Sequence, residues 1–138
     1  MTPTTMPKMP IENWEQVRDE WLAAIEKLMQ DAEEWSRKQD WATRRDPKKI
    51  KERGLGEYIV PRLLIHSIDG RLLLDPMAGE VIGAKGRVEL CVMPSYDSVV
   101  IARLDDGWKM LPQTGDGDLI PLTEETFVST VRRLLATL

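Results

Sequence analysis

RVELCVMPSYDSVVIARLDDGWKML, residues 87–111, has the pattern of three short strands joined by two turns. At its start, the apolar side chains of Val88, Leu90 and Val92 alternate with less apolar ones, which is the period of a half-buried strand. The β-branched run at 99–104 is typical of a buried strand, and turn-forming residues flank it on both sides. The stretch therefore predicts an antiparallel meander.

A long helix is predicted before this meander. Asn13 is the expected N-cap, with Gln16 at the capping-box position. Apolar residues then recur at three- and four-residue spacing and form one stripe, which includes Trp14, Trp21, Leu28 and Trp35. Large aromatic side chains at this spacing are typical of a helix that covers a sheet, so we interpret the stripe as core. Between residues 11 and 40 nine acids oppose four bases, which predicts an acidic outer face.

Two further strands and a final helix complete the predicted fold. Residues 58–68 and 71–75 have strand patterns and are joined by the hairpin signal Asp69-Gly70, while Pro61 favours an edge strand or a bulge. Thr123 is the expected cap of a C-terminal helix with Phe127 on its apolar face. Together these patterns predict an α+β fold, in which a long N-terminal helix and a C-terminal helix pack on one face of a five-stranded, largely antiparallel sheet. We expect residues 1–10 to be a disordered lead-in and residues 11–138 to be a single α+β domain.

Composition and charge exclude several classes of protein. The net charge of −4 gives no global field that favours nucleic acid or an anionic membrane. One cysteine and one histidine cannot form an intrachain disulfide or a Cys/His zinc cluster, and we expect Cys91 to be an inert thiol in a reducing, cytoplasmic compartment. The sequence has no nucleotide-binding fingerprint and no apolar run long enough to span a membrane. We therefore expect no cofactor, no metal and no membrane association.

Residues 40–53, DWATRRDPKKIKER, carry the concentrated positive charge of the chain. Between residues 41 and 53, two acids accompany six bases, which are Arg44, Arg45, Lys48, Lys49, Lys51 and Arg53. Pro47 interrupts any helix here, so we interpret the segment as a solvated connector that balances the acidic helix before it. Carboxylates of that helix are expected to compete for the same bases. The alternative function of the segment is to bind an anion or nucleic acid, with Arg44, Arg45, Lys48 and Lys49 as binding residues.

Two carboxylates could share one edge of the sheet, because Asp75 ends one predicted strand and Glu89 lies in another. This layout resembles PD-(D/E)xK nucleases, in which two carboxylates hold a divalent metal ion and a lysine helps to orient water. The resemblance covers residues 57–92. It departs from the family pattern at Cys91, where the family has lysine, and after residue 93, where a turn and a strand follow instead of a helix. It implies a metal-dependent or degenerate nuclease as an alternative function, with Asp75 and Glu89 as catalytic residues.

The face of the predicted sheet opposite the helices carries charged and soft apolar side chains: Arg87, Glu89, Cys91 and Met93, with Arg71 and Arg103 as an extension. Such a mixture is typical of a recognition surface. Our leading hypothesis is therefore a small, non-catalytic interaction module that binds a protein partner or a second copy of itself, with Arg87 and Met93 among its binding residues. Nucleic acid is the less favoured partner.

Overall fold

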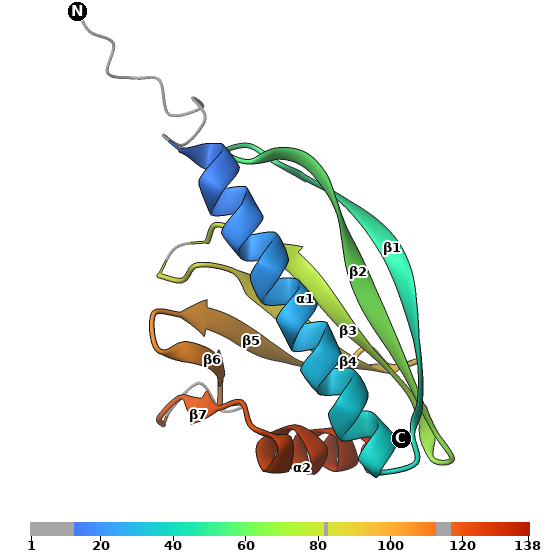
Figure 1. The fold of residues 1–138 in the computed structure, drawn as a ribbon. Coiled ribbons are helices and arrows are strands. Elements are labelled where there is room, and N and C mark those ends of the chain that lie inside the picture. The colour runs from blue at the N-terminus through green and yellow to red at the C-terminus, as the bar shows by residue number, and fades with distance from the viewer. Residues whose placement is uncertain (1–12, 82, 113–116) are drawn as a thin grey trace, which may run out of the picture.

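The computed structural model describes residues 13–81, 83–112 and 117–138 (Figure 1). Over these residues the chain forms two helices and seven strands, in the order α1 (Trp14–Lys38), β1 (Ala42–Glu52), β2 (Gly56–Ser67), β3 (Gly70–Ala78), β4 (Arg87–Met93), β5 (Ser98–Leu104), β6 (Gly107–Met110), β7 (Ile120–Pro121) and α2 (Glu124–Leu135). The strands form one antiparallel meander, whose order in space is the order along the chain.

The predicted α+β fold is confirmed, but the sheet is larger than predicted. It has seven strands instead of five, and the two edges are formed by β1 and the short β7. β1 is the segment interpreted above as a connector. That interpretation is wrong, because every residue of β1 pairs with β2, from Ala42 opposite His66 to Glu52 opposite Gly56. The expected lead-in, residues 1–10, lies outside the described residues.

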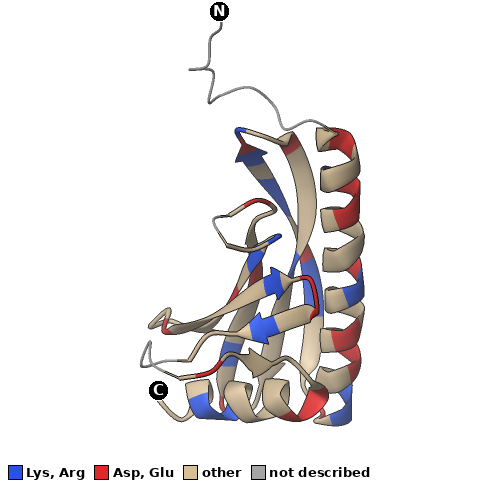
Figure 2. Ribbon diagram, turned by 90° about the vertical axis from the view of Figure 1, so that its left-hand side faces the viewer, with Lys and Arg blue, Asp and Glu red and all other residues tan. Residues whose placement is uncertain are grey.

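Helix α1 crosses the sheet with its apolar stripe turned inward (Figure 1). Trp21 is fully buried, and Trp14 and Trp35 are partly buried against the same core, so the stripe is core as predicted. Acidic residues follow the outer side of α1, also as predicted (Figure 2). Asn13 does occupy the N-cap position, but its backbone is left-handed and its side chain makes no capping hydrogen bond. Neither helix in the described ranges is long and apolar enough to cross a membrane.

Helix α2 is fixed both at its start and along its side. The Thr123 hydroxyl accepts a hydrogen bond from the Thr126 N–H at 3.2 Å, and the Thr126 hydroxyl accepts one from the Thr123 N–H at 2.8 Å. This reciprocal pair satisfies two N–H groups that the first turn of a helix leaves free. Phe127 packs against Trp35 of α1, with ring centroids 5.3 Å apart. The two helices therefore share one core.

The core lies between the helices and one face of the sheet. The cross-strand register places Ile65, Leu72 and Val92 in one row and Leu63, Leu74, Leu90 and Val99 in the next. All seven side chains are at most 4% exposed. Since successive side chains of a strand point to opposite faces, the residues between them form the other face of the sheet.

The β1–β2 hairpin changes the face that it buries at the point where Pro47 lies opposite Pro61. On the side toward β3, Leu63 is buried, whereas beyond the prolines Tyr58 and Val60 are buried. The pairing of β2 with β3 extends only from Leu63 to Ser67. Pro61 has no N–H to donate to a neighbouring strand, which accounts for the end of the pairing near this position. The far end of the hairpin thus leaves β3 and reaches the first half of α1 (Figure 1).

Hydrogen bonds attach this far end to the rest of the molecule. The indole N–H of Trp21 donates to the Tyr58 hydroxyl at 3.0 Å, and that hydroxyl donates to the Glu52 carboxylate. The same carboxylate accepts from the N–H groups of Gly79 and Glu80 at 2.9 and 3.1 Å. Side chains from α1 and from the hairpin therefore meet the backbone that follows β3.

Candidate functional site

The central strands present a second face, which points away from both helices and which we call the open face. Cross-strand pairing places its side chains in four rows: His66, Arg71 and Met93; Leu64, Leu73, Cys91 and Ser98; Asp75, Glu89 and Val100; and Arg87, Ala102 and Lys109. Both α1 and α2 pack on the opposite side, against the buried rows of the core (Figure 1).

Apolar side chains lie in both middle rows of the open face, beside Asp75 and Glu89. Leu64, Leu73 and Val100 are half-buried, and Cys91 among them is only 8% exposed. Burial raises the pKa of the Cys91 thiol, and the negative charges of Asp75 and Glu89 raise it further. The thiol therefore stays protonated near neutral pH, which agrees with the inert thiol predicted from the sequence.

Asp75 and Glu89 lie directly opposite each other on β3 and β4. Each carboxylate already has a cationic partner, since Lys48 Nζ is 2.8 Å from Asp75 Oδ1 and Arg87 Nη2 is 2.6 Å from Glu89 Oε2. The four charges cancel, so a divalent cation would have to displace two bases before both carboxylates could bind it. Over the described ranges, no group of three or more His, Cys, Asp or Glu side chains is placed to hold a metal ion.

Lys48 is a neighbour of Asp75 that sequence reasoning missed. Its ammonium group lies between the Asp75 carboxylate and the Pro76 carbonyl oxygen, to which it donates at 2.8 Å. The contact depends on β1 being a strand, because only then does Lys48 come to lie near β3. This molecule therefore has a lysine beside Asp75 and Glu89. That lysine comes from β1, whereas the nuclease pattern has it at the position of Cys91, on the strand that carries Glu89.

Arg45 on β1 is bound by two acids of α1. Its guanidinium donates to Glu33 at 2.7 and 3.0 Å and to Glu26 at 2.9 Å. Hydrogen bonds to these two carboxylates raise the pKa of Arg45, and the hydrogen bond from Arg45 lowers the pKa of Glu26. The predicted competition between the acidic helix and the basic segment is therefore confirmed at Arg45.

Apart from Lys48, the other bases of β1 are more exposed than Arg45. Lys49 and Lys51 lie 3.3 and 3.7 Å from Glu57 of β2, and their side chains are 65% and 82% exposed. Arg44 is also exposed. Pairs in such solvent-exposed positions contribute little to stability, so these side chains can exchange partners readily.

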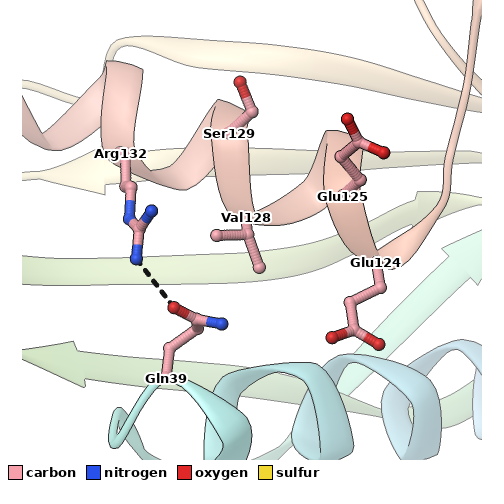
Figure 3. Close-up of a pocket in the computed structure, with 6 residues that line it drawn as sticks. All are labelled: Gln39, Glu124, Glu125, Val128, Ser129 and Arg132. Atoms are coloured by element: carbon pink, nitrogen blue, oxygen red, sulfur yellow. Dashed lines mark hydrogen bonds between the residues drawn. The ribbon is translucent and has the colours of Figure 1, made fainter.

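A hollow of about 360 Å³ lies between the end of α1 and the side of α2, along the stretch from Glu124 to Arg132 (Figure 3). It is lined by Gln39, Glu124, Glu125, Val128, Ser129 and Arg132. Arg132 Nη2 donates to Gln39 Oε1 at 2.7 Å, and Glu124 pairs with Lys38 at 3.1 Å. Because these groups already join the two helices to each other, we assign the hollow to helix packing.

The predicted site residues come from the open face and from β1, and the two sets are in contact. Asp75, Arg87, Glu89 and Met93 lie on the open face. Of the β1 residues, Lys48 reaches Asp75 and Arg44 lies opposite Leu64, whereas Arg45 binds α1 and Lys49 lies near Glu57. The prediction that Arg103 shares the open face is wrong, because Arg103 follows Val99 and Ile101 in the alternation of β5 and pairs with Trp108 on the helix side. Comparisons of the chain with protein-family models, with curated proteins and with solved structures find no match.

Proposed function

We propose that this protein is a non-catalytic binding module that holds a protein partner on its open face. The observation that carries the proposal is the apolar row Leu64, Leu73 and Cys91, which lies in the middle of a sheet face opposite both helices. Arg71 and Arg87 lie on either side of this row and are exposed. An apolar centre bordered by charged residues is typical of a protein–protein interaction surface.

The charges of the open face favour a protein over a nucleic acid. Lys48 is paired with Asp75 and Arg87 with Glu89, so these four groups offer no excess positive charge to a phosphate backbone. The net charge of the chain, −4, acts in the same direction. A second copy of the chain is one form that the protein partner can take.

The states of Asp75, Glu89 and Cys91 argue against catalysis on the open face. General acid–base or nucleophilic chemistry requires a titratable group that is free to exchange a proton with a substrate. On the open face, Asp75 and Glu89 are held in ion pairs, and the pKa of the Cys91 thiol is raised. Asp75 and Glu89 therefore serve in ion pairs and Cys91 serves in packing, which argues against a catalytic role for these three groups.

Site-specific photo-crosslinking tests the proposal. A photoreactive amino acid at Ser98, an exposed position of the open face, should give a discrete protein adduct. Leu73→Arg should abolish the adduct, since it places a charge in the apolar row. The control variant is Ile59→Arg, which alters an apolar side chain that is 64% exposed but lies outside the open face.

Sedimentation equilibrium of the purified protein shows whether the partner is a second copy. An adduct that survives Leu73→Arg, or the lack of any adduct, would contradict the proposal.

The nuclease-like alternative predicts a different result. If Asp75 and Glu89 bound Mg²⁺ or Mn²⁺, millimolar metal would raise the melting temperature of the wild type, and Asp75→Asn or Glu89→Gln would remove that increase. We expect no increase, because Lys48 and Arg87 already neutralise both carboxylates. A carboxylate-dependent increase would favour the enzyme over the binding module.

A further inference from the structure

β1 is an edge strand with one side unpaired. It is the first strand of the sheet, and over the described residues its pairing is with β2 alone. In Figure 1 it forms the outer border of the molecule. All eleven of its residues keep a continuous register with β2. It therefore presents a long, regular row of backbone groups, to which another extended chain could bind.

The opposed prolines determine which backbone groups of β1 point outward. Neither Pro47 nor Pro61 has an N–H, so their rung is one without hydrogen bonds between the two strands. Rungs alternate in an antiparallel pair, and the outward N–H and C=O groups therefore belong to Thr43, Arg45, Lys49 and Lys51. Pro47 contributes an outward C=O but no N–H. The edge thus lacks a single donor, at its middle.

The charged side chains of β1 are mostly basic. Among its eleven residues five bases accompany two acids, although the whole chain has a net charge of −4. Lys49 and Lys51 share one exposed acid, Glu57, and Arg44 is exposed near the other end of the strand. In an added strand, residues opposite these bases would lie about 4.5–5.5 Å away between Cβ atoms, close enough for charge pairing.

We propose that the outer edge of β1 takes an extended acidic segment of another protein as an additional strand. Charge complementarity identifies this occupant, since backbone groups supply the hydrogen bonds and the exposed bases select carboxylates. A second copy is the wrong occupant, because pairing β1 with another β1 would bring rows of like charges together. Lysines and a proline on an edge strand disfavour pairing with most other strands. They therefore restrict which partner can bind, but the outward backbone groups of β1 are still present. The proposal does not depend on the open face.

Fluorescence anisotropy with a synthetic peptide tests this assignment. The probe is a labelled peptide of about nine residues in which Glu alternates with Val or Thr, long enough to span the edge. We expect it to bind the wild type, and the variant with Lys49→Glu and Lys51→Glu together should weaken binding at least about tenfold. The matched control changes the charge equally through Lys85→Glu and Arg133→Glu, two exposed residues that belong to neither β1 nor β2, and it should retain binding. Thermal unfolding of each variant confirms that it is folded.

A second peptide separates strand addition from simple charge attraction. In this peptide every second backbone nitrogen, the set that would face β1, is N-methylated. Methylation removes these hydrogen-bond donors and leaves every carboxylate in place. We expect this peptide to lose binding. Equal binding of the methylated and unmethylated peptides would overturn the proposal, as would an unaffected Lys49→Glu and Lys51→Glu variant. Short DNA that binds more tightly than the acidic peptide, and that this variant releases, would show that the edge binds nucleic acid instead. None of these outcomes alters the crosslink expected from Ser98.

Discussion

At the residue scale, Tyr58 joins the hairpin to α1 through two hydrogen bonds. Its hydroxyl accepts from Trp21 and donates to Glu52, and the ring is only 7% exposed. Burial raises the pKa of Tyr58, and the neighbouring Glu52 carboxylate raises it further. The neutral phenol is thus the form that the fold requires, and this has a consequence for stability in alkaline solution.

We predict that stability falls as the pH rises above about 10, where a tyrosine in an unfolded chain ionises. Below that pH the phenol is neutral in both states, and its contribution to stability is fully present. Above it the unfolded state loses the proton first, so the free energy of unfolding decreases until the pH passes the raised pKa of the native state. Urea midpoints measured at neutral and alkaline pH would show this decrease.

Tyr58→Phe is the control for this prediction. At neutral pH it should cost about 1–3 kcal/mol, because the buried Trp21 N–H is left without an acceptor. Its midpoint should then fall less steeply with pH than that of the wild type. A wild type and a variant with parallel alkaline profiles would show that Tyr58 ionisation is not involved.

A second prediction at this scale concerns Gly86. Its φ is +145°, and a Cβ at this position would lie 2.1 Å from an atom of the Trp21 ring. Gly107 has a comparable φ of +118° but no atom within 4 Å of such a Cβ. Both Gly→Ala variants incur backbone strain, and Gly86→Ala should cost at least about 2 kcal/mol more, because the ring must move. Equal urea midpoints of the two variants would contradict the packing of Trp21 against Gly86.

At the element scale, the outcome for β1 shows what the sequence can and cannot predict. The strands with clear alternation, such as β4, and the apolar stripe of α1 could be predicted because their pattern reports which side is buried. In β1 only Ile50 is buried, and Arg45 faces α1 as an ion-pair partner, so the pattern is absent. An edge strand such as β1 is held in place by hydrogen bonds to the neighbouring strand, and its own sequence does not report that pairing.

The candidate site residues, like the strands, could be predicted only where the local sequence pattern reports their position. The sequence placed Asp75 at the end of one strand and Glu89 in another, so that they could share an edge of the sheet, and the structure shows that the two strands are neighbours. Lys48, the ion-pair partner of Asp75, could not be placed from the sequence, because it comes from β1. Leu64 and Leu73 were hidden within the apolar runs 63–65 and 72–74, where both faces carry leucine or isoleucine and alternation gives no sign of which is exposed.

Helix α2 allows a prediction about its capping box. Thr123→Ala removes the hydroxyl that accepts from the Thr126 N–H and should cost about 0.5–2 kcal/mol. Ser129→Ala, at an exposed position within the same helix, is the control and should change stability by no more than about 0.5 kcal/mol. The urea midpoint reports both. If the two variants lost the same amount, the cap would have no special role.

At the scale of the whole molecule, protection should increase from the edges of the sheet to its centre. β3 and β4 each have a paired strand on both sides, whereas β1 has one. We predict that backbone amides of β3 and β4 exchange with solvent most slowly, and that those of Thr43, Arg45, Lys49 and Lys51 exchange among the fastest in the sheet. Hydrogen exchange followed by NMR measures this. Slow exchange at these four amides would show that the outer edge of β1 is already covered.

The agreement between strand order and chain order also bears on how fast the protein folds. In a meander each strand finds its partner in the strand just before it, so the sheet can grow by closing one short loop at a time, and each closure costs little chain entropy. The helices are different. Gln39 at the end of α1 and Arg132 of α2 are 93 residues apart, and their contact forms only when most of the chain is in place. The rate of folding is therefore expected to depend on the docking of the two helices, and the sheet can form ahead of it.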